Sequence, residues 1–247
     1  MPIETIAPPR RLYRQVADQL RQLFESGEYA VGDRLPAERE LAERMGISRP
    51  TIREALIALE VEGWVRIRIG SGVYVTEPGP HAAVRPADEE GPFEVLQARE
   101  FIESAVAEKA ASLASAADIE AMDSVLSRME NDIHPGQSTL AIDRAFHTTV
   151  AAILDNSVIE RVVGELFDQR MTPFFARLSS YFENPSSWQA ALEEHRLVRD
   201  AIAAGDRGRA RSAMADHLRK SQERFTRSFS STSDPRRKAE EALPGVR

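Results

Sequence analysis

Residues 35–75 contain the pattern that most restricts how this chain can fold. A short helix is predicted to start at Pro36 and to end before Gly46, because proline suits the first turn of a helix and glycine the position just past its end. A second helix is predicted to follow at once, with Ser48 as its N-cap and Pro50 in its first turn. Two short helices joined by so tight a turn predict a helix-turn-helix, whose second helix can enter the major groove of DNA.

The second of these helices has an apolar side and a polar side. Its apolar residues recur at helical spacing and predict a buried stripe: Ile52, Ala55, Leu56 and Leu59. Arg49 and Arg53 are four residues apart and therefore share a face. Ser48 and Thr51 add short hydrogen-bonding groups at the end of the helix that would enter a groove first. The alternative for this stretch is an ordinary surface helix with two solvated arginines.

The stretch that follows predicts a β-hairpin. Residues 64–69 alternate apolar and basic side chains, as a strand with one solvated face does. Gly70 begins a Gly-Ser-Gly turn, and residues 73–75 return as a second strand. The glycines of the turn allow the backbone to approach a phosphate or a minor groove closely. With a further amphipathic helix predicted over 11–26, this part of the chain has three helices and a β-hairpin wing.

Composition limits the classes of function. The 247 residues suffice for two domains, and 42% hydrophobic with 29% charged residues is typical of a soluble globular protein. No apolar run is long enough to span a membrane, and no cysteine is present for disulfides or thiolate metal sites. Prolines and an acid interrupt the N-terminus where a signal peptide would need an apolar core. These features predict a cytoplasmic protein without a membrane partner.

The net charge of −7 argues against a protein that binds nucleic acid through an overall basic field. Residues 1–80 contain eleven arginines, no lysine and twelve acidic residues, so even this part of the chain is not basic. Any affinity for DNA phosphates must come from the placement of a few arginines. Tight binding is therefore expected only where two copies of the chain act together.

Residues 10–77 resemble the winged helix-turn-helix of the GntR family of bacterial transcription regulators. Three separated motifs carry the resemblance in order and spacing: LPAERELA at 35–42, SRPTIREAL at 48–56 and GSGVYV at 70–75. The resemblance implies a double-stranded DNA operator as the partner. It places the DNA contacts on six residues: Arg39, Ser48, Arg49, Thr51, Arg53 and Gly70.

After a predicted linker at 78–91, the sequence pattern becomes entirely helical. Turn and capping residues separate the apolar-periodic stretches, and no strand-like alternation remains. Helices are predicted at about 92–114, 118–132, 139–154, 158–180, 187–204 and 207–229. About six helices with short connections predict an antiparallel bundle over 92–229, followed by a disordered polar tail at 230–247. The fold class predicted for the whole chain is thus mostly α.

Four side chains of this second domain form a candidate metal site. Asp143 and His147 are four residues apart, so both project from one face of a helix, as two ligands of one metal would. His195 and His217 lie on two later predicted helices, which a bundle can bring to the same point. Three imidazoles and one carboxylate suit Zn²⁺, Ni²⁺, Mn²⁺ or a similar divalent ion. Taken singly, each histidine is more often an ordinary surface or core residue.

Residues 92–229 resemble the all-helical effector domain of the FadR-type subgroup of GntR regulators. In that subgroup an Asp-x-x-x-His pair and two later histidines bind a divalent metal, with Zn²⁺ the first expectation here. The resemblance places the ligands at Asp143, His147, His195 and His217. It also matches Arg99 to an arginine that holds the carboxylate of a small effector. The alternative for Arg99 is an exposed ion pair with Glu103 one turn later, which would contribute little.

Residues 91–99 are similar to the same stretch in hexuronate-responsive regulators, although relatives that respond to lactate or galactonate share most of the site. The sequence therefore predicts a dimeric repressor that binds a palindromic operator and is switched by a sugar acid. Two alternatives use the same four ligands: a metal-dependent hydrolase or isomerase fused to a DNA-binding module, and a metal sensor. No His-Glu-x-x-His motif is present, and Glu193 and Glu194, the only candidate bases, are expected to be solvated. No enzymatic activity is predicted.

Overall fold

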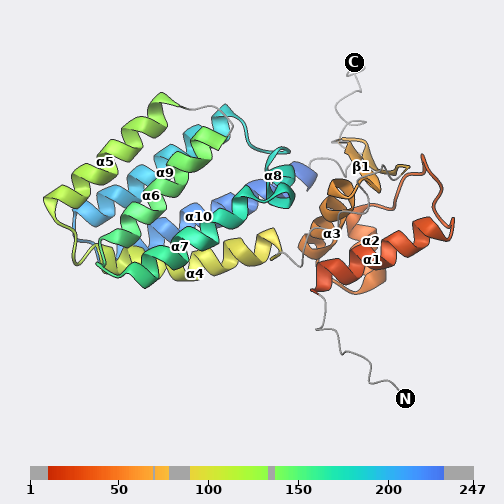
Figure 1. Ribbon diagram of the computed structural model, residues 1–247, viewed down its shortest axis with the longest axis horizontal. Helices are drawn as coiled ribbons and strands as arrows, with labels where there is room; N and C mark the ends of the chain where they lie inside the picture. The colour runs from red at the N-terminus through yellow and green to blue at the C-terminus, as the bar shows by residue number, and fades with distance from the viewer. Residues whose placement is uncertain (1–10, 69, 78–89, 133–136, 231–247) are drawn as a thin grey trace, which may run out of the picture. The chain divides into compact units, whose positions relative to one another are not determined.

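The computed structural model describes residues 11–68, 70–77, 90–132 and 137–230 (Figure 1). Within these ranges the chain is mostly α-helical, as predicted, with one two-stranded sheet. The described residues up to Gly91 form one compact unit, and Pro92–Arg227 form a second. The linker predicted at 78–91 and the tail predicted at 230–247 lie, except at their edges, outside the described residues.

The first unit contains three helices and an antiparallel hairpin. The bounds are α1 (Leu12–Glu25), α2 (Glu38–Met45), α3 (Arg49–Val61), β1 (Val65–Arg68) and β2 (Gly72–Val75). Helices α1 and α2 both pack against α3, whose residues from Ile52 to Leu59 are buried. In the hairpin Val65 lies opposite Val75, and the apolar side chains of β1 are buried while its two arginines are exposed. This unit is a winged helix-turn-helix.

Helix α2 begins two residues after Pro36, where the sequence predicted its start. The backbone N–H of Leu35 donates to the carbonyl oxygen of Val73 at 2.9 Å, and the residue before Leu35 forms an antiparallel bridge with Tyr74. The chain ahead of α2 is therefore held extended beside β2, and helical geometry starts only at Glu38.

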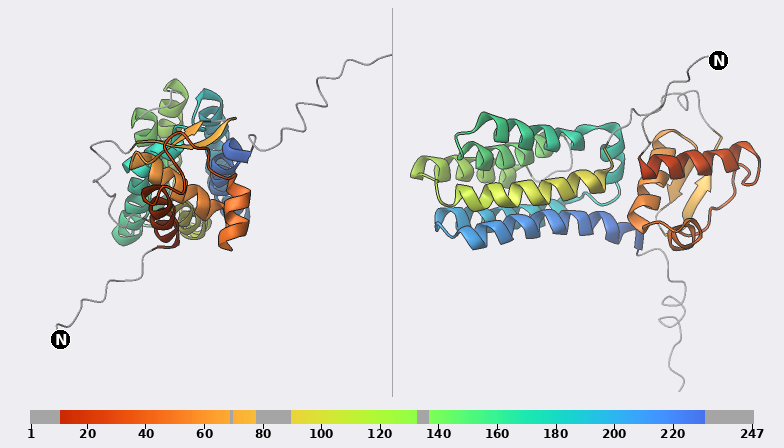
Figure 2. Two further views of the ribbon diagram at one scale, coloured as in Figure 1. Left: turned by 90° about the vertical axis from the view of Figure 1, so that its right-hand side faces the viewer. Right: turned by 90° about the horizontal axis from the view of Figure 1, so that it is seen from below.

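The second unit is a bundle of helices that run side by side (Figure 1, Figure 2). Its elements are α4 (Pro92–Ala110), α5 (Ala116–Asn131), α6 (Gln137–Ala152), α7 (Ser157–Asp168), the 3-10 helix η1 (Gln169–Met171), α8 (Pro173–Ser179), α9 (Pro185–Ala203) and α10 (Arg207–Ser230). Helix α6 packs against α4, α5 and α7, and α9 packs against α4 and α5. Met122, Phe146 and Leu192 are fully buried between them. The bundle thus surrounds α6, which carries two of the predicted metal ligands.

The single helix predicted at 158–180 is wrong. The structure breaks this stretch into α7, η1 and α8. Pro173 has no N–H for a helical hydrogen bond, and Thr172 ahead of it is extended and caps α8 by accepting from the Phe175 N–H. Arg170 lies in the break, in a segment whose backbone is no longer α-helical.

Candidate metal centre and nucleic-acid interface

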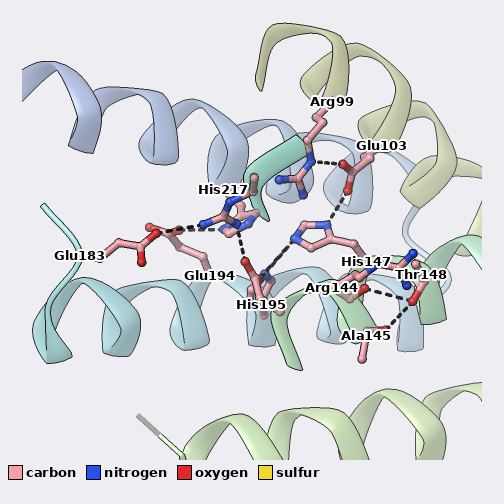
Figure 3. Close-up of polar contacts among 12 residues, drawn as sticks. Arg99, Glu103, Arg144, Ala145, His147, Thr148, Glu183, Glu194, His195 and His217 are labelled. Carbon is pink, nitrogen blue, oxygen red and sulfur yellow. Dashed lines mark hydrogen bonds and ion pairs between the residues drawn. The ribbon is translucent and has the colours of Figure 1, made fainter. Parts of the chain in front are cut away.

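The four predicted metal ligands meet inside the bundle, and Figure 3 shows the three histidines. Asp143 and His147 come from α6, His195 from α9 and His217 from α10, and none is more than 4% exposed. One potential ligand atom from each lies within 4.8 Å of all the others. His147 Nε2 is 3.4 Å from His195 Nε2, and Asp143 Oδ1 is 3.3 Å from His195 Nε2. The sequence therefore located a real cluster, drawn from three helices.

Two buried carboxylates hold the outer nitrogens of this cluster. Glu103 Oε2 on α4 lies 2.5 Å from His147 Nδ1, and Glu194 Oε2 on α9 lies 2.9 Å from His217 Nδ1. A carboxylate on Nδ1 favours the tautomer with the proton there, which leaves Nε2 as a lone-pair donor facing the cluster. The prediction that Glu194 is solvated is wrong, because this side chain is buried and contacts a candidate ligand.

Burial shapes the protonation of the three histidines. It lowers the pKa of His195 well below its usual range, and the neighbouring His217 lowers it further. Burial also lowers the pKa of His217, although the hydrogen bond to Glu194 acts in the opposite direction. For His147 burial lowers the pKa, but the charge of Glu103 and the hydrogen bonds to Asp143 and Glu103 together outweigh burial and raise it. Two of the three imidazoles are thus held neutral, as metal ligands must be.

The buried carboxylates are ionised despite their burial. For Glu103, the adjacent Arg99 and His147 outweigh the effect of burial and lower the pKa to about 2. For Asp143, burial raises the pKa, but contacts with His147 and Arg170 outweigh it and hold the pKa well below the usual range. Both groups are therefore negative at neutral pH.

The residues present fit a divalent cation. Nitrogen lone pairs that face one another at 3.4 Å repel unless a proton or a cation lies between them. Asp143 Oδ1, which lies 3.3 Å from His195 Nε2, is buried and has no hydrogen-bond partner among the described residues. Three imidazole nitrogens and one carboxylate oxygen are ligands that Zn²⁺ accepts, and Ni²⁺ or Mn²⁺ accepts them too.

Arg99, the predicted effector residue, lies on α4 beside this cluster. Its Nε donates to Glu103 Oε1 at 2.6 Å, so a chain of contacts runs from Arg99 through Glu103 to His147 (Figure 3). The guanidinium also lies over the ring of Phe167, 4.6 Å from its centroid. The alternative of an exposed ion pair is wrong in one respect: the pair with Glu103 exists, but Arg99 is 1% exposed. Its buried Nη2 has no acceptor among the described residues.

Sequence reasoning missed a second arginine at the centre. Arg170 Nη1 donates to Asp143 Oδ2 at 2.6 Å, and its Nη2 donates to Glu183 Oε1 at 3.3 Å. Arg170 falls in the middle of the single helix predicted at 158–180, and nothing in the sequence distinguished it from an ordinary surface arginine. The Thr-Pro step that follows it was the available signal of a helix break.

A pocket adjoins the centre between the metal ligands and the start of α9. Its lining residues are Asp143, Arg170, Phe182, Glu183, Ser187, Trp188, Ala191, His217, Ser221 and Arg224. The cavity volume is only about 20 Å³. That is space for one or two water molecules, so a larger ligand requires the lining side chains to move.

The predicted DNA contacts lie on α2, α3 and the turn of the wing. Arg39 and Arg49 are exposed, with 79% and 44% of their side-chain surface accessible. Ser48 caps α3 as predicted, because its Oγ accepts from the Thr51 N–H at 3.3 Å, and the two hydroxyl oxygens are 2.8 Å apart. Gly70 has a φ of +79°, a conformation that favours glycine, at the exposed tip of the hairpin.

Arg53 differs from the other predicted contacts. Its side chain is 1% exposed, and it donates to Glu38 at the start of α2 through Nε at 3.2 Å and Nη2 at 2.7 Å. In this structure Arg53 joins the two helices of the helix-turn-helix. Four arginines outside the predicted contacts are exposed as well: Arg34 before α2, Arg44 on α2, and Arg66 and Arg68 on β1.

No helix in the described part of the chain combines the length and the apolar character needed to cross a bilayer.

Comparison with known proteins agrees with both units. Residues 12–75 match the family described as "Bacterial regulatory proteins, gntR family", and residues 94–220 match the FCD domain. The chain is 36% identical over 211 residues to the Uxu operon regulator of Haemophilus influenzae, covering 84% of this chain and 79% of that protein. It is 36% identical over 221 residues to the Exu regulon transcriptional regulator of Escherichia coli K12, covering 86% and 84%.

A third relative extends the match. The chain is 34% identical over 236 residues to the Uxu operon transcriptional regulator of Escherichia coli K12, covering 91% of this chain and 90% of that protein. All three are named as regulators of an operon or a regulon. This chain is therefore a member of the GntR family of bacterial transcription regulators, with a winged helix-turn-helix followed by an FCD domain.

Proposed function

We propose that this regulator binds a palindromic operator as a homodimeric repressor, in the bacterial cytoplasm at the nucleoid, and that a small carboxylate switches it. The effector would be held by a divalent metal at Asp143, His147, His195 and His217, together with Arg99. The observation that carries the proposal is the contact chain Arg99–Glu103–His147, which joins the predicted effector residue directly to the buried ligand cluster.

The charges around the centre favour an anion. Four carboxylates surround it, on Glu103, Asp143, Glu183 and Glu194, with three guanidinium groups on Arg99, Arg170 and Arg224. With neutral imidazoles these groups sum to one negative charge when the exposed Lys220, 3.9 Å from Glu194, is left out. A bound divalent cation changes the sum to one positive charge, in a buried setting where charges interact strongly. A monoanionic acid would neutralise that charge.

The arrangement also supports an acid that carries hydroxyl groups. The buried Nη2 of Arg99 can donate to a carboxylate oxygen without breaking the existing bond from Nε to Glu103. A bound metal would supply positions for oxygen ligands, and a hexuronate offers a carboxylate with neighbouring hydroxyls. The names of the relatives, regulators of the uxu and exu genes, point to the same class of compound.

We assign different roles to the predicted DNA-contacting residues. Arg39 and Arg49 would reach the duplex directly, with Ser48, Thr51 and Gly70 placing short groups against its backbone. Arg53 would support α3 from inside. Each recognition helix would read one half-site, and the dimer would bring two together. Because Arg99 and Glu103 lie on α4, which follows Gly91 directly, effector binding can bias the placement of the winged unit.

A thermal-shift screen of the Zn²⁺-loaded protein tests the effector part. D-glucuronate and D-galacturonate should raise the melting temperature, since a ligand at 100 times its Kd stabilises the folded state by about 2.7 kcal/mol. The same acids should then change the affinity for a duplex selected from random DNA. If no acid stabilises the metal-loaded protein while chelation alone changes DNA affinity, the metal-sensor alternative replaces this proposal.

A further inference from the structure

The pocket beside the centre contains one tryptophan, Trp188, in the first turn of α9. The side chain is 4% exposed, and its Nε1 is buried without a hydrogen-bond acceptor among the described residues. An indole N–H can only donate, so burial without an acceptor is unfavourable. A polar atom of a ligand in this pocket would remove that penalty.

The backbone that carries Trp188 is firmly fixed. Asn184 and Ser187 form a capping box at the start of α9: the Ser187 N–H donates to Asn184 Oδ1 at 3.0 Å, and the Asn184 N–H donates to Ser187 Oγ at 2.9 Å. Pro185 stands in the same turn. The indole is therefore presented by a rigid helix start, which suits a group that recognises a ligand by position.

The charged side chains of the pocket already have oppositely charged partners. Glu183 accepts from Arg170, and Arg224 donates to Glu194 at 2.9 and 3.1 Å. Arg170 Nε is a second buried donor that lacks an acceptor among the described residues. The carboxylates and guanidinium groups of the pocket are thus paired with one another, whereas Trp188 is a neutral donor. A neutral donor suits a hydroxyl or ring oxygen better than a second carboxylate.

We propose that Trp188 is a specificity-determining residue whose indole N–H donates to a hydroxyl or ring oxygen of the effector, away from the carboxylate that Arg99 and the metal would hold. This inference rests on the proposed function. It implies that the pocket favours sugar acids over short hydroxy acids such as lactate, which have no oxygen to reach Trp188. A site built to hydrogen-bond a hydroxyl discriminates strongly against analogues that lack it, because its own polar group is left unpaired.

The test is Trp188→Phe in the full-length, Zn²⁺-loaded protein, which removes the N–H and keeps an aromatic ring. Calorimetric titration with D-galacturonate and D-glucuronate should show an affinity about 5- to 100-fold weaker than that of the unchanged protein. Zn²⁺ affinity should stay the same. Trp64→Phe is the matched control, because Trp64 is the other tryptophan of the chain and lies in the winged unit. It should leave the affinity for both acids unchanged.

A second measurement covers the case in which Trp188→Phe folds poorly. In the Zn²⁺-loaded Trp64→Phe protein, Trp188 is the only tryptophan, so D-galacturonate should shift its emission and lactate should not. Equal hexuronate affinity with and without Trp188, or an unchanged emission at saturating D-galacturonate, overturns the inference. Failure of the unchanged protein to bind any acid would instead overturn the proposed function.

Discussion

Arg53 and Arg49 lie one turn apart on α3, and replacing them should have opposite consequences. The guanidinium of Arg53 is buried and makes two hydrogen bonds to Glu38. The side chain of Arg49 is 44% exposed, and its contact with the same carboxylate is long, at 3.9 Å. Arg53→Ala should therefore destabilise the winged unit. Arg49→Ala should leave the unit stable and remove operator binding.

The size of the effect follows from burial. Breaking a buried ion pair by removing one partner costs about 3–5 kcal/mol, because the other charge stays buried. The Glu38 side chain is 11% exposed, so little solvent is available to compensate it. A unit of about 65 residues has a free energy of unfolding of only about 3–10 kcal/mol, so Arg53→Ala should remove a large share of it. An exposed pair such as Arg49–Glu38 contributes about 0–1 kcal/mol.

Urea unfolding followed by Trp64 emission measures these differences in the winged unit. A Trp188→Phe background removes the other tryptophan. Arg53→Ala should lower the urea midpoint by about 1–5 M, while Arg49→Ala should leave it unchanged. The double variant Arg53→Ala with Glu38→Ala should regain part of the loss, because no buried charge is left without a partner.

One outcome would refute this reasoning. If Arg53→Ala unfolds at the same urea concentration as the unchanged protein and yet fails to bind a selected operator duplex, Arg53 acts on DNA directly and does not serve mainly as a structural link. Arg49→Ala supplies the comparison, since it should keep Zn²⁺ and acid binding while operator binding is lost.

Three further predictions concern the metal centre. Glu103→Gln and Glu194→Gln should each weaken Zn²⁺ binding by about 10- to 100-fold in a competition titration with a chelating dye, whereas exposed Asp216→Asn should not. Chelation of a metal-loaded sample should lower the melting temperature of the helical unit, and an unchanged value would mean that the cluster holds no ion. In the metal-free protein, stability should fall from pH 7 to pH 5, because His195 and His217, whose pKa values are lowered by burial, take up protons more readily when unfolded. His147, with a raised pKa, opposes this trend, and a melting temperature that rises toward pH 5 would contradict the prediction.

The sequence could predict which four side chains meet at the centre but not the groups that support them. Asp143 and His147 share a helix face through their spacing, and family resemblance supplied His195 and His217. Their supporting groups follow from tertiary packing, which spacing does not encode. Arg170 reaches Asp143 from 27 positions away, across a helix break.

Glu194 shows a similar limit. It stands beside Glu193, which is exposed, and the pair resembles an ordinary solvated face. Only the position of α10, which brings His217 and Arg224 against it, makes Glu194 a buried partner. Spacing and resemblance therefore predict the residues that meet at the centre, whereas only packing shows the residues that orient them.

The winged unit shows why its ability to bind DNA could not be judged from its net charge. A count treats all eleven arginines of residues 1–80 alike, whereas the structure separates them by burial. Arg14 and Arg21 both contact the buried Glu62, and Arg53 contacts Glu38, so three guanidinium groups are committed to the interior. Some of the acidic residues of segment 1–80 therefore neutralise interior arginines and do not weaken the surface that would face DNA.

The arginines left at the surface set a limit on DNA affinity. In the described part of the winged unit they are Arg34, Arg39, Arg44, Arg49, Arg66 and Arg68. Arg44 is paired with Glu40, and Arg39 lies 3.8 Å from Glu43. Each phosphate contact adds about −0.9 to the slope of log affinity against log salt concentration, so one unit with three or four contacts should show a slope of about −3 to −4. Two units on one operator should double it. A measured slope near −3 for the full-length protein would contradict a dimer on DNA, whereas a slope near −7 would require two copies.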